Sequence, residues 1–207
     1  MKGPLFITFE GGEGAGKTTL IDHMASELSS KGCSLIRARE PGGTVVGEEI
    51  RKILLQPKIL SPYTELTLFL ASRAQHIAEV IRPALTAQKI VLCDRFNDST
   101  IAYQGAARGL GIEKVTEFCS FISENLEPDL TFYLDLDPKI GLSRIQRSKD
   151  RIEAEDLSFH IKIRNAFHEL AKRCPHRLHI LDASQTPAKV LADAMELVYN
   201  KLQRSAV

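Results

Sequence analysis

A glycine-rich loop near the start of the chain constrains the fold more than any other feature of the sequence. Residues 11–18 read Gly-Gly-Glu-Gly-Ala-Gly-Lys-Thr and satisfy the pattern GxxxxGK(S/T). The apolar segment 4–10 precedes the loop and predicts a buried strand, and segment 19–28 predicts a helix. A strand, a glycine loop and a helix in this order are typical of a phosphate-binding loop, in which backbone N–H groups and the helix N-terminus surround phosphate oxygens. The loop therefore predicts a site for a nucleoside triphosphate.

Individual residues of the loop have separate roles in binding the triphosphate. Lys17 supplies a positive charge for the terminal phosphates, and the Thr18 hydroxyl is a ligand for Mg²⁺. We expect ATP to lie against these residues of the loop and of the helix that follows it: Gly11, Gly12, Glu13, Gly14, Ala15, Gly16, Lys17, Thr18 and Thr19. A glycine-rich turn without a ligand is the alternative, and the strand and helix on either side make it the weaker interpretation.

The composition argues against several classes of partner. The 207 residues are 43% hydrophobic and 26% charged, which is ordinary for a globular protein. A net charge of +1 gives no overall attraction to nucleic acid or to an anionic membrane. No apolar run of about eighteen residues occurs, and the N-terminal residues do not resemble a signal peptide. We expect a cytoplasmic protein whose ligands are small molecules.

Short apolar segments alternate with longer amphipathic ones along the chain. The expected strands are 5–10, 34–38, 90–94, 130–135 and 179–181. The expected helices are 17–31, 46–55, 62–88, 97–108, 113–125, 138–147, 156–173 and 187–204. Strands separated by helices predict an α/β fold with three layers, in which a five-stranded parallel sheet is flanked by helices. We interpret residues 1–207 as a single domain.

The end of the third expected strand carries a second candidate site. Ligands of open α/β sheets bind beyond the carboxyl ends of the strands, and Asp94 and Arg95 stand at such an end. In phosphate-loop enzymes a carboxylate at this position orients Mg²⁺ or its waters, and Arg95 would then lie beside the reacting phosphates. A helix cap or a surface carboxylate is the alternative for Asp94, and the upstream loop favours the metal role.

One arginine falls on the apolar face of a long predicted helix. The apolar residues of segment 62–88 form one sector at 100° per residue, and Arg73 lies inside that sector. A buried guanidinium without a partner is costly, so Arg73 needs an acceptor in the protein or in a ligand. Phe69 lies one helical turn earlier, and a planar ring for stacking beside a guanidinium group for hydrogen bonding suits a nucleobase. An internal ion pair for Arg73, with plain core packing for Phe69, explains the spacing equally well.

Two further segments carry candidate ligand contacts. Gln104 follows the third strand closely, and its amide both donates and accepts, which suits a base edge. The basic segment 144–151 has no helical apolar stripe in its middle and is a candidate lid that brings arginines to a phosphate. A solvated charged loop is the more common fate of such a segment, but beside a phosphate-binding loop we favour the lid.

Taken together, these motifs resemble the thymidylate kinase family, a group of nucleoside monophosphate kinases, over nearly the whole chain. The resemblance rests on segments 9–18, 39–44, 69–73, 94–95, 102–105, 128–130 and 133–135. It implies transfer of the γ-phosphate of ATP to dTMP with the help of Mg²⁺, giving dTDP and ADP for dTTP synthesis by de novo and salvage routes. It also implies a homodimer.

The resemblance implies roles in binding the base of dTMP. Phe69 would stack on thymine, and Arg73 and Gln104 would form hydrogen bonds with its edge. Thr100 would approach the base from the segment that follows the third strand.

Other roles concern the sugar, the phosphates and the adenine. Arg51 and Arg95 would hold the dTMP phosphate, and Glu13 would approach the sugar near its 3′-hydroxyl. Tyr103 would pack under the deoxyribose and disfavour a 2′-hydroxyl. Arg144 would flank the adenine of ATP.

The resemblance also indicates a subtype. Some family members carry an arginine within the phosphate-binding loop, but residues 11–18 of this chain contain none. Arg147 and Arg151 instead lie in the expected lid, about residues 144–155, as in mainly bacterial members whose lid supplies the catalytic arginine. Arg151 is the first candidate for the phosphate contact and Arg147 the second. The full catalytic set expected is Lys17, Arg95, Arg147, Arg151 and Glu13.

Two other activities remain as alternatives. A kinase for another nucleotide or nucleoside would use the same loop, although Arg73 and Gln104 together favour a thymine or uracil edge. A regulatory switch or ATPase would bind nucleotide to control a partner and would hydrolyse ATP without a nucleotide acceptor.

Overall fold

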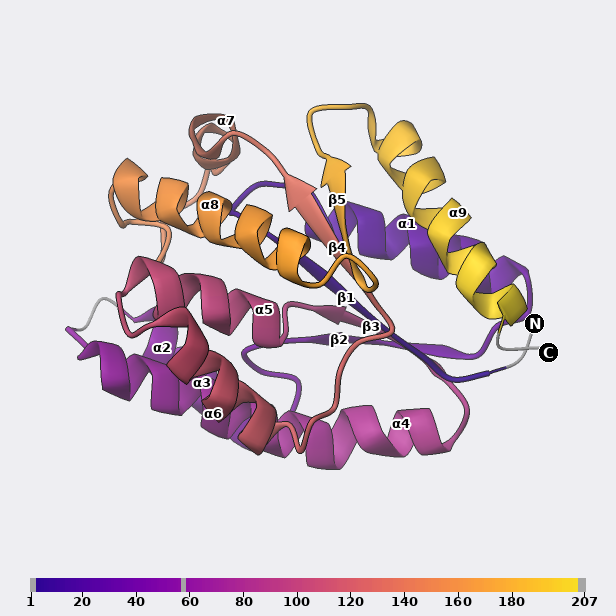
Figure 1. Cartoon of the computed structure of the whole chain (residues 1–207), viewed down its shortest axis with the longest axis horizontal. Helices are drawn as coiled ribbons and strands as arrows, with labels where there is room; N and C mark the ends of the chain where they lie inside the picture. Colours follow the sequence, from indigo (N-terminus) through magenta and orange to yellow (C-terminus); the bar gives the residue numbers. More distant parts are fainter. Residues whose placement is uncertain (1–2, 57–58, 205–207) are drawn as a thin grey trace.

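Five parallel strands form the centre of the protein in the computed structural model, which describes residues 3–56 and 59–204 (Figure 1). Neighbouring strands follow the order β2-β3-β1-β4-β5. Their bounds are β1 Leu5–Gly11, β2 Leu35–Arg39, β3 Ile90–Asp94, β4 Leu130–Asp135 and β5 Leu178–Asp182. The α/β fold and the five-stranded parallel sheet expected from the sequence are therefore confirmed. Residues 1–2, 57–58 and 205–207 of the predicted domain lie outside the described residues.

Helices cover both faces of the sheet and make the three layers. Two of them, α1 (Lys17–Ser30) and α9 (Pro187–Arg204), pack together on one face. The other side carries α2 (Val45–Leu55), α3 (Pro62–His76), α4 (Arg82–Thr86), α5 (Asn97–Thr100), α6 (Ile112–Ile122) and α8 (Leu157–Arg173). The short helix α7 (Pro138–Ser143) follows β4. Among residues 3–56 and 59–204, no helix combines the length and the apolarity needed to cross a membrane.

Two of the expected helices contain π-helical segments. The expected helix 62–88 consists of α3, the π-helix η1 (Ile77–Ile81) and α4. Pro83 explains this interruption, because proline lacks an N–H and its ring crowds the preceding turn, which a wider π turn relieves. The expected helix 97–108 likewise consists of α5 and the π-helix η2 (Ile101–Ala107). Such segments are frequent at functional sites, and η2 carries both Tyr103 and Gln104.

The prediction of a helix over residues 138–147 is wrong in its second half. The helix α7 ends at Ser143, and Arg144 and Ile145 continue as a tightened turn through bonds to the carbonyls of Gly141 and Leu142. The residues that follow have no apolar stripe to hold a helix against the protein, and they belong to the segment that the sequence predicts to be a lid.

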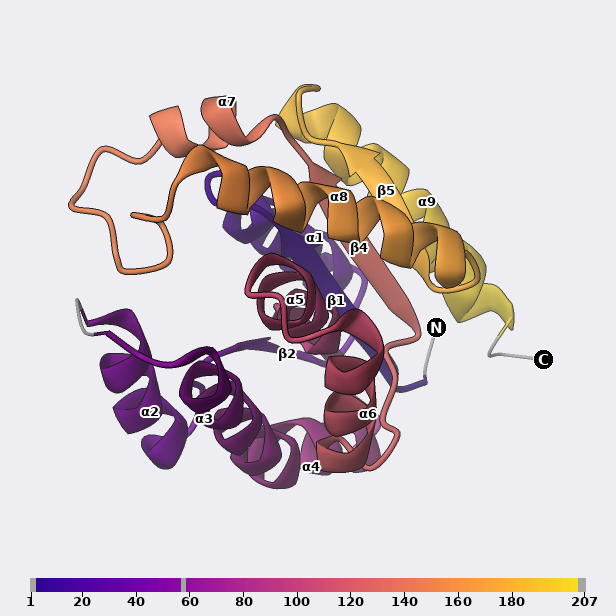
Figure 2. The same cartoon turned by 60° about the vertical axis from the view of Figure 1, so that its left-hand side comes forward.

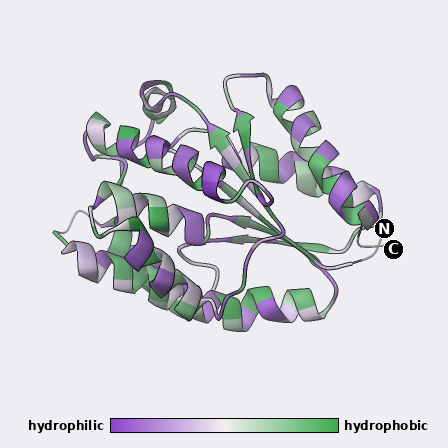
Figure 3. Ribbon diagram, in the orientation of Figure 1, coloured by the Kyte–Doolittle hydropathy of each residue, from purple (hydrophilic) through white to green (hydrophobic). Residues whose placement is uncertain are grey.

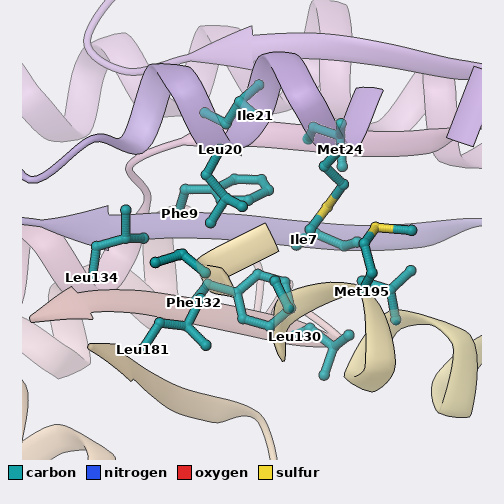
Figure 4. Close-up of a cluster of buried hydrophobic side chains, with 14 of the residues drawn as sticks. Ile7, Phe9, Leu20, Ile21, Met24, Leu130, Phe132, Leu134, Leu181 and Met195 are labelled. Carbon is teal, nitrogen blue, oxygen red and sulfur yellow. The ribbon is translucent and has the colours of Figure 1, made fainter. Parts of the chain in front are cut away.

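The hydrophobic core is divided by the sheet, because successive side chains of a strand point to opposite faces. Ile7 and Phe9 of β1 face α1 and α9 and belong to the same core cluster as Met195 of α9 (Figure 4). Phe6, the residue before Ile7, faces the other side, where its ring meets that of Phe96 edge-on at 5.0 Å. The strands are mainly hydrophobic and the helices are mixed (Figure 3), as expected for a sheet buried between two helical layers.

Candidate active site

A pocket of about 560 Å³ opens at the carboxyl ends of the central strands. Its walls come from the phosphate-binding loop, the ends of β2 and β3, helices α2 and α3, the π-helix η2 and the segment between α7 and α8. In Figure 2 that segment, which contains the expected lid, extends out on the same side of the molecule as α2. Every residue that the sequence analysis assigned to a site lines this pocket except Gly11, Gly12 and Arg151.

The loop between β1 and α1 has the backbone that a phosphate site needs. Gly14 and Gly16 have φ angles of +67° and +96°, which side chains rarely tolerate. A Cβ atom at Gly14 would also lie 2.2 Å from the carbonyl oxygen of Gly141, so no larger residue fits there. The Lys17 ammonium donates to the carbonyl oxygens of Gly11 at 3.2 Å and Gly12 at 3.1 Å. The lysine is thus held against the loop at the start of α1.

Glu13, Arg95 and Tyr103 form a cluster in the middle of the pocket. Arg95 Nη2 donates to Glu13 Oε1 at 2.7 Å, and the Tyr103 hydroxyl donates to the same oxygen at 2.9 Å. Burial alone would raise the pKa of Glu13, but Arg95 and Lys17 together lower it to about 2. The carboxylate is therefore charged throughout the physiological range. An acidic group thus lies inside a loop that is otherwise built for anions.

The backbone of Arg95 is strained in a way that aims its side chain. Its φ angle is +69°, a left-handed conformation that costs a residue other than glycine roughly 1–3 kcal/mol. The guanidinium also donates to Gly11 O at 2.9 Å and to Ser99 Oγ at 3.1 Å, and it lies over the Tyr103 ring. These contacts compensate for the strain and fix the positive charge at the end of β3.

Two oxygen ligands suited to a divalent cation lie in the same pocket. Asp94 ends β3, and its Oδ1 is buried without a hydrogen-bond partner among the described residues. Thr18 lines the pocket at the start of α1. A carboxylate and a hydroxyl are ligands that Mg²⁺ prefers, and the unpartnered oxygen is what a metal or its water would satisfy. The residues present therefore fit the ion expected from the sequence.

Arg73 has a partner within the protein, which is one of the two alternatives that the sequence allowed. The side chain is 2% exposed, and its Nε donates to Glu40 Oε2 at 2.7 Å. Nη1 donates to Thr100 Oγ1 at 2.9 Å, and His76 Nδ1 lies 2.9 Å from the second oxygen of Glu40. The ion pair holds the guanidinium in place, and Arg73 still lines the pocket. Both interpretations of this residue are thus compatible with the structure.

Gln104 is fixed by a carboxylate on the neighbouring helix. The side chain is 1% exposed, and its Nε2 donates to Glu65 Oε1 at 2.8 Å. Phe69 lies on α3 between Glu65 and Arg73, with one turn to each, and is half-buried at the wall of the pocket. An aromatic ring, a donor and an amide therefore surround one end of the cavity.

A second group of cations lies toward the end of β2. Arg51 Nη1 donates to the carbonyl oxygen of Pro41 at 2.9 Å, and Arg39 pairs with Glu48 at 2.8 Å. Burial and the charge of Arg39 lower the pKa of Arg51. Two arginines at one wall repel each other, and an anion between them would relieve that repulsion.

The two lid arginines have different surroundings. Arg147 forms a bidentate ion pair with Glu153, at 2.8 and 2.6 Å, and lines the pocket. Arg151 donates from Nη1 to Glu65 Oε2 at 2.6 Å and from Nε to Leu54 O at 2.9 Å, so it ties the lid to α2 and α3. In this conformation the structure brings Arg147 to the cavity and holds Arg151 outside it. Arg144, at the base of the lid, donates to Gly14 O at 3.0 Å.

Three buried glutamates, none of them among the residues predicted for the site, hold these side chains in place. Glu40 holds Arg73, and Glu65 holds Gln104. Glu10 accepts bonds from the N–H of Phe96 and from the Ser99 hydroxyl, while burial and Asp98 raise its pKa to about 8. Signals for all three exist: Glu10 and Glu40 stand at the ends of strands.

For Glu65 the signal is helical spacing. Glu65, Phe69 and Arg73 follow one another at intervals of four and share one helix face.

Comparisons with known proteins show which family this chain resembles. The family model described as thymidylate kinase matches residues 9–194. A thymidylate kinase of Protochlamydia amoebophila is 49% identical, over 93% of this chain and 91% of that protein. One from a Geobacillus species is 46% identical over 98% and 99% of the two chains. The crystal structure of the thymidylate kinase from Ehrlichia chaffeensis superposes with a TM-score of 0.79 and 33% identity, over 95% of this chain and 99% of the other.

Proposed function

The chain belongs to the thymidylate kinase family, and on that premise we propose that the pocket at the carboxyl ends of the strands transfers the γ-phosphate of ATP to dTMP. The enzyme phosphorylates dTMP to dTDP with ATP as donor, in the synthesis of dTTP. One observation carries the assignment of the site. The phosphate-binding loop shares a single cavity with Phe69, Arg73 and Gln104, so the donor and acceptor nucleotides would lie side by side.

The base end of the pocket suits thymine for a chemical reason. Arg73 is a donor only, and the Gln104 amide has an acceptor oxygen on the side away from Glu65. Thymine and uracil present an N3–H donor beside the O4 acceptor, which complements this pair. Cytosine presents an N3 acceptor beside an amino donor and would be mismatched at both positions. Phe69 would stack on the ring.

The sugar lies next to the central cluster in this proposal. The Glu13 carboxylate would accept a bond from the 3′-hydroxyl, and the Tyr103 ring would leave no room for a 2′-hydroxyl. The pairing of Tyr103 with Glu13 at 2.9 Å supports this, because it holds both groups at one place in the pocket.

Phosphoryl transfer here needs positioning and charge more than acid–base chemistry. The dTMP phosphate is already an anion, so it can attack in line without a strong general base. Arg51 and Arg95 would hold it, and Lys17 would stabilise the charge that develops on the transferred group. Of the lid arginines, we propose that Arg147 reaches that group and that Arg151 anchors the closed lid to Glu65. Arg144 would flank the adenine.

We propose that Asp94 and Thr18 hold Mg²⁺, partly through water. When bound, the ion would neutralise charge on the ATP phosphates. The unpartnered Oδ1 of Asp94 beside the phosphate-binding loop supports the assignment.

A homodimer is the assembly we propose, with α3 and α6 at its interface. These helices pack together, and their outer side exposes Tyr63, Phe118 and Phe121, the last with 79% exposure. Exposed aromatic residues on adjacent helices are typical of a covered surface. Phe121→Glu should give a monomer in sedimentation. The control Ile161→Glu, at an exposed position on α8, should leave the dimer intact. A dimeric Phe121→Glu protein would rule out this interface.

A substrate panel tests the proposal as a whole. ADP release is measured with dTMP, dUMP, dCMP, AMP and thymidine as acceptors. The highest kcat/KM should belong to dTMP, and a higher value for dCMP, AMP or thymidine would overturn the assignment. ATP turnover that does not depend on any acceptor would instead support the switch or ATPase. The cytoplasmic location and the single domain over residues 1–207 remain predictions.

A further inference from the structure

Glu65 is a buried carboxylate whose oxygens are almost entirely used within the protein. It stands in the first turn of α3 and is 1% exposed. Its Oε1 accepts from Gln104 Nε2 at 2.8 Å and from Arg108 Nε at 3.1 Å. Its Oε2 accepts from Arg151 Nη1 at 2.6 Å and from Arg108 Nη2 at 3.2 Å. Burial raises the pKa of Glu65, but the donors from Arg108, Gln104 and Arg151 outweigh it and hold the pKa below its usual value.

An ionised carboxylate can only accept hydrogen bonds, and this decides how the neighbouring amide is turned. The two ends of a glutamine amide are similar in shape and differ in chemistry, since one donates and the other accepts. Glu65 admits only the nitrogen of Gln104 at the contact of 2.8 Å. The oxygen of the amide is then directed away from Glu65. Because Gln104 lines the pocket, the cavity receives an acceptor from this residue.

The orientation matters because it distinguishes two pyrimidine edges. An amide oxygen accepts from the N3–H of thymine or uracil and repels the N3 lone pair of cytosine. If the amide were free to rotate by 180°, its NH₂ group would donate to N3 of cytosine just as well. A glutamine at this position therefore selects between these bases only if something outside the ligand fixes it.

We propose that Glu65 is a positioning residue that fixes the orientation of the Gln104 amide and thereby sets the preference for a pyrimidine with N3–H. The inference rests on the proposed function, because it assumes that Gln104 faces the acceptor base. Glu65 does not touch the nucleotide in this proposal and acts through Gln104. Its ion pairs with Arg108 and Arg151 keep it charged, and so keep it an acceptor.

The test compares dTMP with 5-methyl-dCMP, which has the same methyl group, sugar and phosphate but the opposite edge. The quantity measured is kcat/KM for dTMP divided by kcat/KM for 5-methyl-dCMP. The assay is run above neutral pH, so that N3 of cytosine is unprotonated. A variant that changes the lid, the binding of ATP or the overall stability changes kcat/KM for both nucleotides by the same factor. Such effects cancel in the ratio. Only a change in how the base edge is read alters it.

Two substitutions at Glu65 release the amide by different routes. In Glu65→Gln, the new amide can accept from Gln104 or donate to it, so both orientations of Gln104 become possible. In Glu65→Asp, the charge for the flexible Arg108 and Arg151 is kept while the carboxylate is withdrawn by one methylene from Gln104. The second variant guards against a failure to fold. Arg108→Gln is the matched control, because it removes another partner of Glu65 without touching the Gln104 contact.

We expect the ratio to fall about tenfold or more in both Glu65 variants, because an opposed pair of acceptors becomes a hydrogen bond. Arg108→Gln should keep the wild-type ratio. A wild-type ratio in folded Glu65→Asp would overturn the inference, and so would an equal fall in Arg108→Gln, which would indicate general loosening of the helix contact. If the wild-type enzyme itself did not prefer dTMP, the proposed reading of the base would fail as well.

Discussion

The ion pair between Arg73 and Glu40 gives a prediction that separates structural from ligand-binding roles. Both side chains are nearly inaccessible, 2% and 3% exposed, and Nε lies 2.7 Å from Oε2. Replacing Arg73 with methionine leaves a buried carboxylate whose remaining hydrogen-bond partner among the described residues is His76. Removing one member of a buried pair costs about 3–5 kcal/mol, whereas replacing both with neutral groups is often close to neutral.

Four proteins are compared: the wild type, Arg73→Met, Glu40→Gln and the double variant. We expect each single variant to lose about 3–5 kcal/mol of unfolding free energy in urea and the double variant to lose about 1–2 kcal/mol. The affinity for dTMP, measured by calorimetry, should behave differently. It should fall by roughly 1–3 kcal/mol whenever Arg73 is absent, including in the double variant, because a charged hydrogen bond to the base is lost.

Two results would refute this reasoning. If the double variant recovered wild-type affinity for dTMP, Arg73 would serve only the internal ion pair, and its place in base recognition would be wrong. If Arg73→Met were as stable as the wild type, the buried Glu40 carboxylate would not depend on the guanidinium.

Three further predictions follow from the same geometry. Lys17→Ala should lower kcat by about 10²-fold or more, because the charge that would face the transferred phosphate is lost. Its hydrogen bonds to other described residues are to two loop carbonyls, so circular dichroism should stay near wild type. A near-normal kcat would contradict a role for Lys17 in catalysis. The pKa of Glu13 is lowered from 4.5 to about 2 in the folded protein, so its carboxylate stabilises the fold by about 3 kcal/mol above pH 4.5 and loses this as the pH falls through 2. The difference in unfolding free energy between the wild type and Glu13→Gln should therefore shrink from pH 5 to pH 2, and a constant difference would contradict the lowered pKa. Phe132→Ala, at a position with no exposure in the core, should cost about 3–5 kcal/mol in urea, while the exposed control Ile161→Ala should cost less than about 1 kcal/mol.

Local sequence patterns were sufficient for the sheet and for the phosphate-binding loop. An apolar strand, glycines and Lys17 lie within fifteen consecutive residues, and each acts through the backbone conformation of its own segment. Asp94 and Arg95 were found by the same logic, because the carboxyl ends of parallel strands must meet at one edge. All five expected strands occur within about two residues of their predicted ends.

The helices were predicted less well where the chain departs from the regular α-helical period. A period of 3.6 residues does not describe π-helical turns, so it missed the segment before Pro83 and the one that contains Tyr103. The expected lid was predicted to begin inside a helix, but that helix ends at Ser143, because the residues that follow have no apolar stripe to hold a helix against the protein.

The choice of partners was decided by the tertiary structure alone. From spacing, Arg73 required an acceptor, but Glu40 lies 33 positions away and reaches it only because β2 and α3 converge on the pocket. The sequence favoured Arg151 over Arg147 for the phosphate contact, yet Arg147 lines the cavity and Arg151 is bound to Glu65. The sequence by itself determined the backbone frame and which residue types were available, since these follow from local conformation and side-chain chemistry. Which carboxylate holds which cation depends on long-range packing, because a hydrogen bond acts over about 3 Å and only the folded chain sets such distances.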